Sequence, residues 1–186
     1  MTRIDLGCDF IDVTEVSARL WIAFDAGALR VVHWSEAGSR AQDALRPHGA
    51  PERRPLPDAW RDSLTRYIAG DEVDLTALPI APEGTPFQQT VWSALRGIPR
   101  GHVRTYAGIA RDIGKPRAMR AVGAANGRNP LAIVVPCHRV VEAGMLLGGY
   151  TGGVRFKRFL LELEGVRIVG DHVQPGQLDL LGRSQV

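Results

Sequence analysis

Residues 105–126 read T-Y-A-G-I-A-R-D-I-G-K-P-R-A-M-R-A-V-G-A-A-N and contain two short helical patterns. The first covers residues 105–113 and is stopped by Gly114 and Pro116, and the second covers residues 117–126. Two short helices joined by a turn that contains glycine are typical of a helix-turn-helix unit. Many helical proteins contain such a pair without binding DNA, so the pattern by itself leaves a purely structural role open.

The second helical pattern combines very small side chains with arginines. The small residues are Ala121, Gly123, Ala124, Ala125 and Gly127, and the arginines beside them are Arg117, Arg120 and Arg128. Glycine in a helix costs about 1 kcal/mol relative to alanine, so the small side chains predict a surface that another backbone approaches closely. Packing on a neighbouring helix is the alternative, but it does not account for the arginines.

Charge is distributed unevenly along the chain. The formal net charge is +3, but residues 1–85 hold 9 Arg against 14 Asp or Glu, whereas residues 86–186 hold 14 Lys or Arg against 6 Asp or Glu. The first part therefore carries −5 and the second +8. A basic region of this kind predicts a polyanionic partner, with a solvated basic face as the alternative.

Composition and cysteine content narrow the class of protein. Hydrophobic residues make up 45% and charged residues 23% of the 186 residues, as in ordinary globular proteins. No apolar run reaches the roughly 18 residues of a membrane span, and the first residues do not read as a secretory signal. Two cysteines cannot build a disulfide framework. We therefore expect a cytoplasmic protein. We expect no metal site, because the candidate ligands lack close spacing; they are Cys8, His33, His48 and His102.

The first part of the chain mixes strand and helix patterns. Residues 18–25 and 28–34 carry aromatic and β-branched side chains around an Ala-Gly turn, which predicts a β-hairpin. Residues 36–57 are rich in Gly, Pro and Arg, so we expect a loop. Residues 58–69 place apolar side chains at helical spacing before Gly70. This part is therefore expected to be a small α/β layer.

A proline-rich segment, L-P-I-A-P-E-G-T-P at residues 78–86, lies where the charge changes sign. Thr85 is suited to cap a helix and Pro86 to occupy its first turn. We place the domain boundary at this segment. The predicted parts are an N-terminal α/β domain at residues 1–80, a linker at 81–84, a mainly helical C-terminal domain at 85–170 and a loose tail at 171–186.

A cysteine and a histidine are adjacent in V-V-P-C-H-R-V-V, residues 134–141, and the β-branched pairs predict a buried strand. A thiol attacks as the thiolate and needs a base, but neighbours on a strand point to opposite faces. Either Cys137 lies in a turn at the strand's end, or a water carries its proton to His138. Glu162 and Glu164 could orient the imidazole. A structural core thiol remains the alternative.

Four motifs occur in order around this cysteine: R-A-V-G-A-A-N-G-R-N-P from residue 120, P-C-H-R-V from residue 136, G-G-Y-T-G-G from residue 148 and L-E-L-E-G from residue 161. Together they closely resemble the O6-alkylguanine-DNA alkyltransferase family over residues 84–168, and more loosely before residue 80. The resemblance implies a small ribonuclease H-like α/β domain followed by a mainly helical domain of the winged helix-turn-helix type that carries the active site.

The resemblance also implies DNA repair by irreversible, single-turnover transfer of an alkyl group, without a cofactor, from O6-alkylguanine and from O4-alkylthymine to Cys137. His138 would act as base through a bound water, Glu164 would orient His138, and Asn129 would brace the site. Carbonyls near Cys137 and Val140 would accept the guanine amino group. The residues implied for the alkylguanine pocket are Tyr106, Val140, Tyr150 and Thr151.

For DNA, the resemblance implies binding through the minor groove with the target base rotated out of the duplex. Arg120 would enter the base stack in its place, and Tyr106 would donate to the leaving base and help rotate its phosphate. The other residues implied for DNA binding are Ala107, Lys115 and Arg117. We expect a monomer that can cluster on DNA.

Other functions remain open on the residues alone. A cysteine hydrolase would use Cys137, His138 and Glu164 repeatedly, and would not need Arg120 on an exposed helix. A DNA-binding module that recognises lesions without chemistry would not need the thiol. A regulatory protein of the adaptive-response type would need further domains, which we do not expect within these 186 residues.

Overall fold

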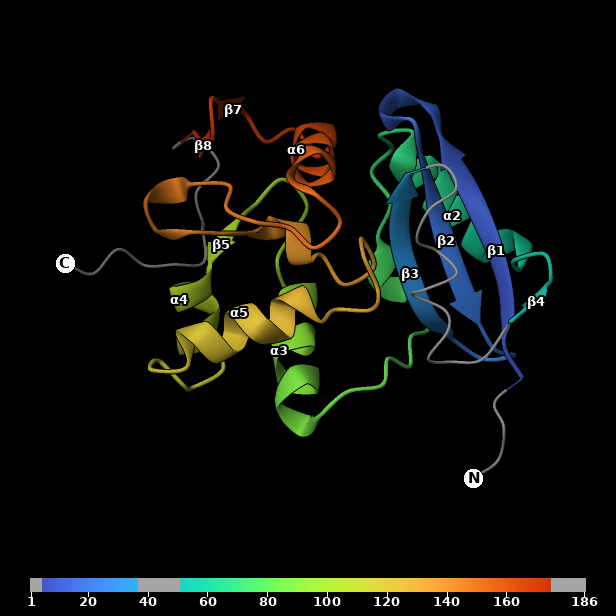
Figure 1. The fold of residues 1–186 in the computed structure, drawn as a ribbon, viewed down its shortest axis with the longest axis horizontal. Helices are drawn as coiled ribbons and strands as arrows, with labels where there is room; N and C mark the ends of the chain where they lie inside the picture. Colours follow the sequence, from blue (N-terminus) through green and yellow to red (C-terminus); the bar gives the residue numbers. More distant parts are fainter. Residues whose placement is uncertain (1–4, 37–50, 175–186) are drawn as a thin grey trace. The chain divides into compact units, whose positions relative to one another are not determined.

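The computed structural model describes residues 5–36 and 51–174 (Figure 1). It divides into two compact units, one formed by Met1–Glu83 with Pro130–Val134 and the other by Gly84–Asn129 with Val135–Val186. Both helices and strands are present among the described residues, so the mixed α/β class is confirmed. No pattern in the sequence indicates that Pro130–Val134 belongs to the first unit.

A four-stranded sheet in the order β3-β2-β1-β4 forms the centre of the first unit. The strands β1 (Gly7–Val13), β2 (Ala18–Phe24) and β3 (Leu29–Glu36) are consecutive antiparallel neighbours, joined between β1 and β2 by the short 3-10 helix η1 (Thr14–Val16). The β2–β3 pair confirms the predicted hairpin, whose turn matches its short Ala-Gly connection.

The predicted loop over residues 36–57 is wrong at one point. Glu52 and Arg53 form the short strand β4 (Glu52–Arg53), which pairs parallel with β1. A two-residue strand has too few positions to show alternation, so its pairing could not be recognised from the sequence. Residues 37–50, which make up most of the predicted loop, lie outside the described residues.

Helix α2 (Asp58–Ile68) confirms the helix predicted for residues 58–69. Its buried side chains Leu64, Tyr67 and Ile68 follow the helical period, and Gly70, with φ of 96°, ends it in the left-handed region. The short 3-10 helix η3 (Leu75–Ala77) follows. The segment Pro130–Val134 completes this unit beside β3 through backbone hydrogen bonds between Val32 and both Pro130 and Ala132, of 2.8 and 2.9 Å.

Four α-helices are described in the second unit: α3 (Pro86–Arg96), α4 (Tyr106–Asp112), α5 (Met119–Gly127) and α6 (Val154–Leu163). Thr85 caps α3 as predicted, because its side chain accepts from the Gln88 amide at 3.3 Å while the Gln88 side chain accepts from the Thr85 amide at 2.8 Å. The short helices α4 and α5, separated by a turn, pack on each other and on α3.

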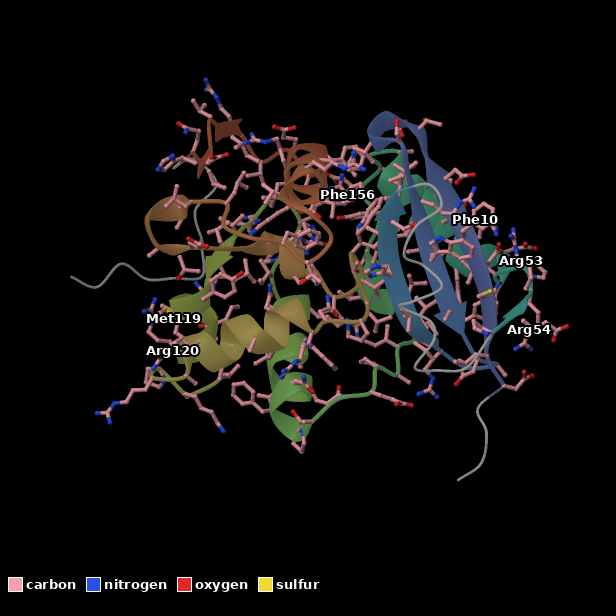
Figure 2. All side chains as sticks on the ribbon, in the orientation of Figure 1. Phe10, Arg53, Arg54, Met119, Arg120 and Phe156 are labelled. Atoms are coloured by element: carbon pink, nitrogen blue, oxygen red, sulfur yellow. The ribbon has the colours of Figure 1, made fainter. Side chains whose placement is uncertain are left out.

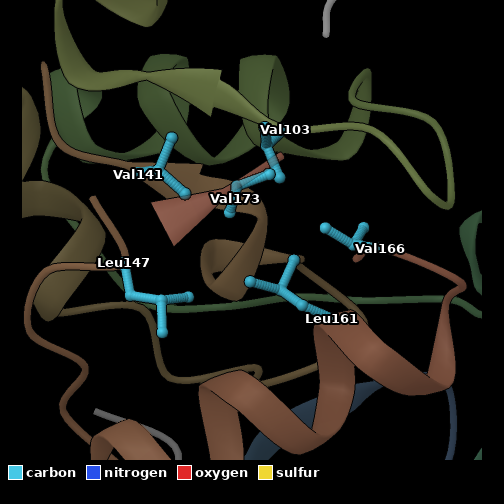
Figure 3. Close-up of a cluster of buried hydrophobic side chains, with 6 residues drawn as sticks. All are labelled: Val103, Val141, Leu147, Leu161, Val166 and Val173. Carbon is cyan, nitrogen blue, oxygen red and sulfur yellow. The ribbon is translucent and has the colours of Figure 1, made fainter. Parts of the chain in front are cut away.

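Two small strand pairs complete the second unit. β5 (Arg104–Thr105) runs parallel to β6 (Val140–Val141), and β7 (Ile168–Val169) runs antiparallel to β8 (His172–Val173). A 3-10 helix, η5 (Ala143–Met145), follows β6. Figure 3 shows the core cluster around them, formed by Val103, Val141, Leu147, Leu161, Val166 and Val173.

The position of Val173 corrects the predicted tail. A loose segment was expected from Asp171 onward, but β8 pairs with β7 and buries Val173 in the cluster of Figure 3. The strand is again only two residues long and shows no periodicity. The remainder of the predicted tail, from residue 175, lies outside the described residues. Along the parts of the chain that the structure describes, every helix is too short or too polar to cross a bilayer.

Candidate active site

Residues 134–141 do not form the predicted strand. Cys137 begins a 3-10 turn, η4 (Cys137–Arg139), and only β6 is extended. The Cys137 amide donates to the Val135 carbonyl at 2.8 Å across Pro136, whose φ of −79° and ψ of 64° are those of an inverse γ-turn. Proline has no amide hydrogen for a strand ladder, so the chain turns there. Cys137 therefore lies in a turn, as in the first of the two arrangements considered above.

The thiol of Cys137 is buried and held by two side chains. Its Sγ accepts from Asn129 Nδ2 at 3.0 Å and lies 3.8 Å from the Tyr150 hydroxyl. The same Asn129 nitrogen donates to the Val135 carbonyl at 2.7 Å. Burial raises the pKa of Cys137, while hydrogen bonds with Asn129 and Tyr150 and the charge of Lys157 lower it. The site therefore favours the thiol but contains groups that stabilise the thiolate.

His138 and Glu164 form a buried pair beside this cysteine. His138 Nε2 lies 3.0 Å from Glu164 Oε1, and the histidine has no exposed surface. Burial lowers the pKa of His138, although Glu164 raises it. The imidazole is therefore neutral near pH 7 and can accept a proton. Glu164 caps the end of α6 and contacts the histidine, whereas the other candidate, Glu162, is exposed.

Arg139 is a third member of this buried group that the sequence analysis did not include. Its Nε donates to Glu164 Oε2 at 2.9 Å and its Nη2 to Oε1 at 2.8 Å, while Nη1 donates to the Ile98 carbonyl at 2.5 Å. Burial raises the pKa of Glu164, but His138 and Arg139 outweigh it and hold that pKa far below its usual range. Glu164 is therefore ionised at neutral pH, and Arg139 donates one hydrogen bond to each of its carboxylate oxygens.

Lys157 of α6 is also buried and was not recognised from the sequence. It donates through Nζ to the carbonyls of Leu147 and, at 3.4 Å, Gly149. Burial lowers its pKa to about 8, although the charges of Cys137 and Glu142 raise it. A buried lysine is rare unless it is paired. Here it ties α6 to the glycine-rich loop before Tyr150 and brings positive charge toward the thiol.

Asn126 is the third residue that the sequence analysis did not assign to the site. It lies one helical turn after the buried Val122 on α5, and only 7% of its surface is exposed. Its Nδ2 lies 3.5 Å from the Cys137 carbonyl oxygen. The available signal was a polar residue on the otherwise apolar buried face of α5, since buried polar side chains are nearly always hydrogen-bonded.

The predicted pocket residues differ in their burial and in their contacts. Tyr106, the first residue of α4, is half-buried; burial and the charges of Cys137 and Glu142 raise its pKa, and a hydrogen bond with Asn126 lowers it. Val140 is fully buried. Thr151 is exposed, and its hydroxyl donates to the Gly127 carbonyl at 3.0 Å. The structure therefore brings Tyr106 and Tyr150 to the thiol and places Thr151 at the end of α5.

The predicted DNA-binding side chains lie mostly on the surface of the second unit. Lys115, Arg117 and Arg120 are exposed, and Ala107 is half-buried. Figure 2 shows Arg120 beside Met119, at the beginning of α5. Lys115 and Arg117 also line an open hollow of about 380 Å³ at the turn between α4 and α5. These residues form a basic surface around the first turn of α5.

The two glycines of α5, Gly123 and Gly127, are not required by packing within the second unit. A Cβ atom added at Gly123 would come no closer than 3.9 Å to Tyr106, and one added at Gly127 would lie 3.6 Å from Thr151 Oγ1. Both are ordinary van der Waals distances. Ala121, Ala124 and Gly127 are exposed beside the arginines. Close packing on a neighbouring helix therefore does not explain these two glycines.

Among the described residues, the candidate metal ligands Cys8, His33 and His102 do not form a metal-binding group. Within residues 5–36 and 51–174, no group of three or more His, Cys, Asp or Glu side chains lies close enough to hold a metal ion. Cys8 is buried in β1, and its Sγ donates to the Pro51 carbonyl at 3.6 Å. His48 lies outside these residues.

Comparison with known proteins identifies the family that this chain resembles. A family model described as the DNA-binding domain of 6-O-methylguanine DNA methyltransferase matches residues 86–166. A methylated-DNA–protein-cysteine methyltransferase of Methanosarcina acetivorans is 50% identical, over 59% of this chain and 76% of that protein. A protein of the same name from Salmonella typhimurium is 43% identical, over 78% of this chain and 89% of that protein.

Solved structures extend the similarity to most of the chain. The crystal structure of Mycobacterium tuberculosis OGT in complex with DNA matches with a TM-score of 0.72 and 39% identity, and the match covers 85% of this chain and 92% of that one. The O6-methylguanine-DNA methyltransferase of Pyrococcus kodakaraensis matches with a TM-score of 0.65 and 29% identity, over 87% of this chain and 99% of that one. Both units therefore have counterparts in solved structures.

Proposed function

The chain belongs to the methylated-DNA–protein-cysteine methyltransferase family, and we propose that it repairs DNA by transferring the alkyl group of O6-alkylguanine, and of O4-alkylthymine, to Cys137. The observation that carries the proposal is the buried Cys137 thiol, whose Sγ lies 3.0 Å from Asn129 Nδ2. The next residue, His138, is paired with Glu164. A nucleophile, a neutral base and an anion that orients the base are the parts that thiol alkylation needs.

The proposed reaction is a direct displacement. His138 takes the proton of Cys137 through a water, and the thiolate attacks the alkyl carbon. The new bond joins Sγ to carbon while the bond between carbon and O6 breaks, and its electron pair stays on the guanine. The anionic base is stabilised by a hydrogen bond from Tyr106 and takes up the proton that the thiol released. The thioether on Cys137 has no leaving group to regenerate the thiol, so each molecule reacts once.

The alkylated base must leave the duplex to reach a buried thiol, at a cost of a few kcal/mol. In the proposed complex α5 enters the minor groove, where its small residues allow close approach of the DNA. Arg120 fills the gap in the base stack, since its planar cation can stack and pair with phosphate. Ala107, Lys115 and Arg117 contact the backbone of the DNA. The minor groove carries a degenerate code, which suits a protein that must scan any sequence.

The alkylguanine pocket in this proposal is formed by Tyr106, Val140, Tyr150 and Thr151, with backbone carbonyls near Cys137 and Val140 accepting the guanine amino group. The two units are proposed to be the ribonuclease H-like domain and the winged helix-turn-helix domain of the family. The relative from M. tuberculosis was crystallised in complex with DNA, which supports DNA as the partner of this chain as well.

The proposal is tested by incubating the protein with an excess of duplex that contains one O6-methylguanine. We expect each molecule to gain the mass of one methyl group, on the peptide that contains Cys137, and the reaction to stop at one equivalent. Continued turnover without labelled protein would instead indicate a cysteine hydrolase, and binding without any mass gain would indicate a lesion-recognition module.

Replacing Arg120 with alanine should slow repair in duplex DNA by about 10-fold or more, because no side chain then fills the gap that the flipped base leaves in the stack. Reaction with the free base O6-methylguanine should change less than about 2-fold, since no stack has to be opened. The measurement is the rate of methyl transfer to Cys137 with each substrate. Arg66→Ala is the matched control, since Arg66 is an exposed arginine on α2. Equal losses on both substrates would remove the proposed role of Arg120.

Replacing Lys157 with methionine should raise the pH at which Cys137 becomes reactive by about one unit, because a nearby cation favours the thiolate. The difference from the wild type should be largest below pH 8 and become smaller above it, since the pKa of Lys157 is about 8 and its charge is lost there. The measurement is the rate of Cys137 alkylation by iodoacetamide from pH 6 to 10. Arg155→Met, an exposed change on the same helix, should leave the profile unchanged. Superimposable profiles for Lys157→Met and wild type would refute the electrostatic role.

A further inference from the structure

Asn126 combines burial with an unused hydrogen-bonding group. Its side chain comes from α5 and only 7% of the residue is exposed. Nδ2 lies 3.5 Å from the Cys137 carbonyl oxygen, and the side chain is also within hydrogen-bonding reach of the Tyr106 hydroxyl. Across the described part of the chain, however, the Asn126 amide oxygen is buried and accepts no hydrogen bond.

An unpaired buried acceptor is unfavourable for folding. The neighbouring buried positions on α5, Val122 and Ala125, are apolar, and an apolar residue at position 126 would avoid the penalty. The Asn129 side chain, by contrast, donates to the Val135 carbonyl and the thiol, and its amide oxygen is not a buried acceptor without a partner. The amide oxygen of Asn126 therefore has no structural role that the fold accounts for, which indicates a ligand.

The surroundings of Asn126 indicate where that ligand lies. Tyr106 and Cys137, the two groups that its amide approaches, are the proposed hydrogen-bond donor to the base and the proposed nucleophile. A ligand that satisfies the Asn126 oxygen must present a donor. In O6-alkylguanine the ring nitrogens of the free edges and the alkylated oxygen are acceptors, and the exocyclic 2-amino group is the donor.

We propose that the Asn126 amide oxygen accepts a hydrogen bond from the 2-amino group of the flipped guanine, so that Asn126 determines specificity for alkylated guanine over alkylated bases that lack this group. This inference rests on the proposed function. The other amino hydrogen is shared by the carbonyls of Cys137 and Val140 named above, and the Cys137 carbonyl lies 3.5 Å from Asn126 Nδ2. O6-methylhypoxanthine and O4-methylthymine lack the amino group, and they leave the Asn126 oxygen unpaired in the complex.

The test compares O6-methylguanine with O6-methylhypoxanthine, which differ only in the 2-amino group, placed in the same duplex. Single-turnover rates of methyl transfer to Cys137 are measured for wild type, Asn126→Leu and Asn126→Asp. The wild type should prefer O6-methylguanine by about 10-fold or more, as expected when a buried polar group loses its partner. Asn126→Leu should reduce the preference to about 2-fold, and Asn126→Asp, which keeps an acceptor, should retain most of it.

Thermal unfolding identifies any variant that does not fold, and Asn126→Met replaces the leucine variant in that case because methionine adapts to irregular space. The free bases are measured in parallel, so that an effect on DNA binding is separated from an effect in the pocket. A preference that is the same in wild type and in a folded apolar variant overturns the inference. A wild type that transfers no methyl group to Cys137 from either substrate overturns the proposed function instead.

Discussion

Replacing Cys137 with serine should abolish methyl transfer from O6-methylguanine to the protein. Serine has nearly the shape of cysteine, so the contact with Asn129 at 3.0 Å can be kept and the fold should lose no more than about 1–2 kcal/mol. The hydroxyl is a far weaker nucleophile at neutral pH than a thiolate. Mass spectrometry of wild type and variant after reaction with the duplex should show one added methyl group and none, respectively.

Cys8 provides the control for this experiment. It is the only other cysteine in the chain and is also buried, and burial raises its pKa above the ordinary value. Its environment lacks the His138–Glu164 pair. Cys8→Ser should therefore accept one methyl group at the rate of the wild type. Methylation of Cys8, or of the Cys137→Ser protein, would contradict the assignment of the acceptor.

Helices with complete local signals could be predicted from the sequence. Helix α3 has its cap at Thr85, its proline at the first position and an apolar stripe, and α2 ends at Gly70. Among the elements that were missed, β4 and β8 are strands of two residues; β4 pairs with the distant β1, and β8 pairs with the neighbouring β7. A periodic pattern needs one or two helical turns, or several residues of a strand, before it can be detected. A strand of two residues is too short to show one.

The predicted strand over residues 134–141 failed for a related reason. Its β-branched residues favour extended structure, but Pro136 cannot donate to a sheet, and the chain makes the inverse γ-turn that positions Cys137. The proline was visible in the sequence and is a sufficient signal against a regular central strand. The turn, which determines where the thiol points, follows from the same residue.

The residues of the candidate site also fall into two groups, those that the sequence predicts and those that it does not. Cys137, His138, Glu164 and Asn129 were assigned because they lie in motifs, and the structure brings them together. Lys157 and Asn126 contact the site through carbonyls of Leu147 and Cys137. Backbone carbonyls are present at every residue, so the sequence contains no partner that could identify such contacts. Tertiary structure identifies these contacts, although the position of Asn126 among the buried apolar residues of α5 is a signal that the sequence does contain.

Replacing Glu164 with glutamine should have the largest effect on stability. The Glu164 carboxylate accepts two hydrogen bonds, of 2.9 and 2.8 Å, from the buried Arg139 guanidinium. The change leaves this buried cation without its anionic partner. Removing one partner of a buried ion pair typically costs about 3–5 kcal/mol. Urea unfolding at pH 7 measures the loss. Glu162→Gln is the matched control on the same helix: Glu162 is exposed and pairs with Arg158 at 3.7 Å, so about 0.5 kcal/mol or less is expected.

The same substitution should remove part of the acid sensitivity of the wild type. The pKa of Glu164 is lower in the folded protein than in the unfolded chain, where it is about 4.3. The unfolded state therefore binds more protons below that pH, and the carboxylate's contribution to stability is present above it and lost as the pH falls toward the folded value. The Glu164→Gln variant has no such group. The difference in free energy of unfolding between wild type and variant should therefore shrink as the pH falls from 5 to 3. Parallel stability curves over that range would refute this linkage.

A double variant that removes both charges distinguishes the contribution of Glu164 to stability from its role in the reaction. In Glu164→Gln with Arg139→Met the buried cation is removed as well, so the double variant should be more stable than Glu164→Gln alone, as for buried ion pairs replaced by neutral groups. Its rate of methyl transfer should nevertheless remain about 10²-fold below wild type, because His138 lacks the anion that orients it and supports its protonation. Recovery of both stability and rate would mean that Glu164 acts only through the fold, whereas recovery of stability alone assigns it to the orientation of His138.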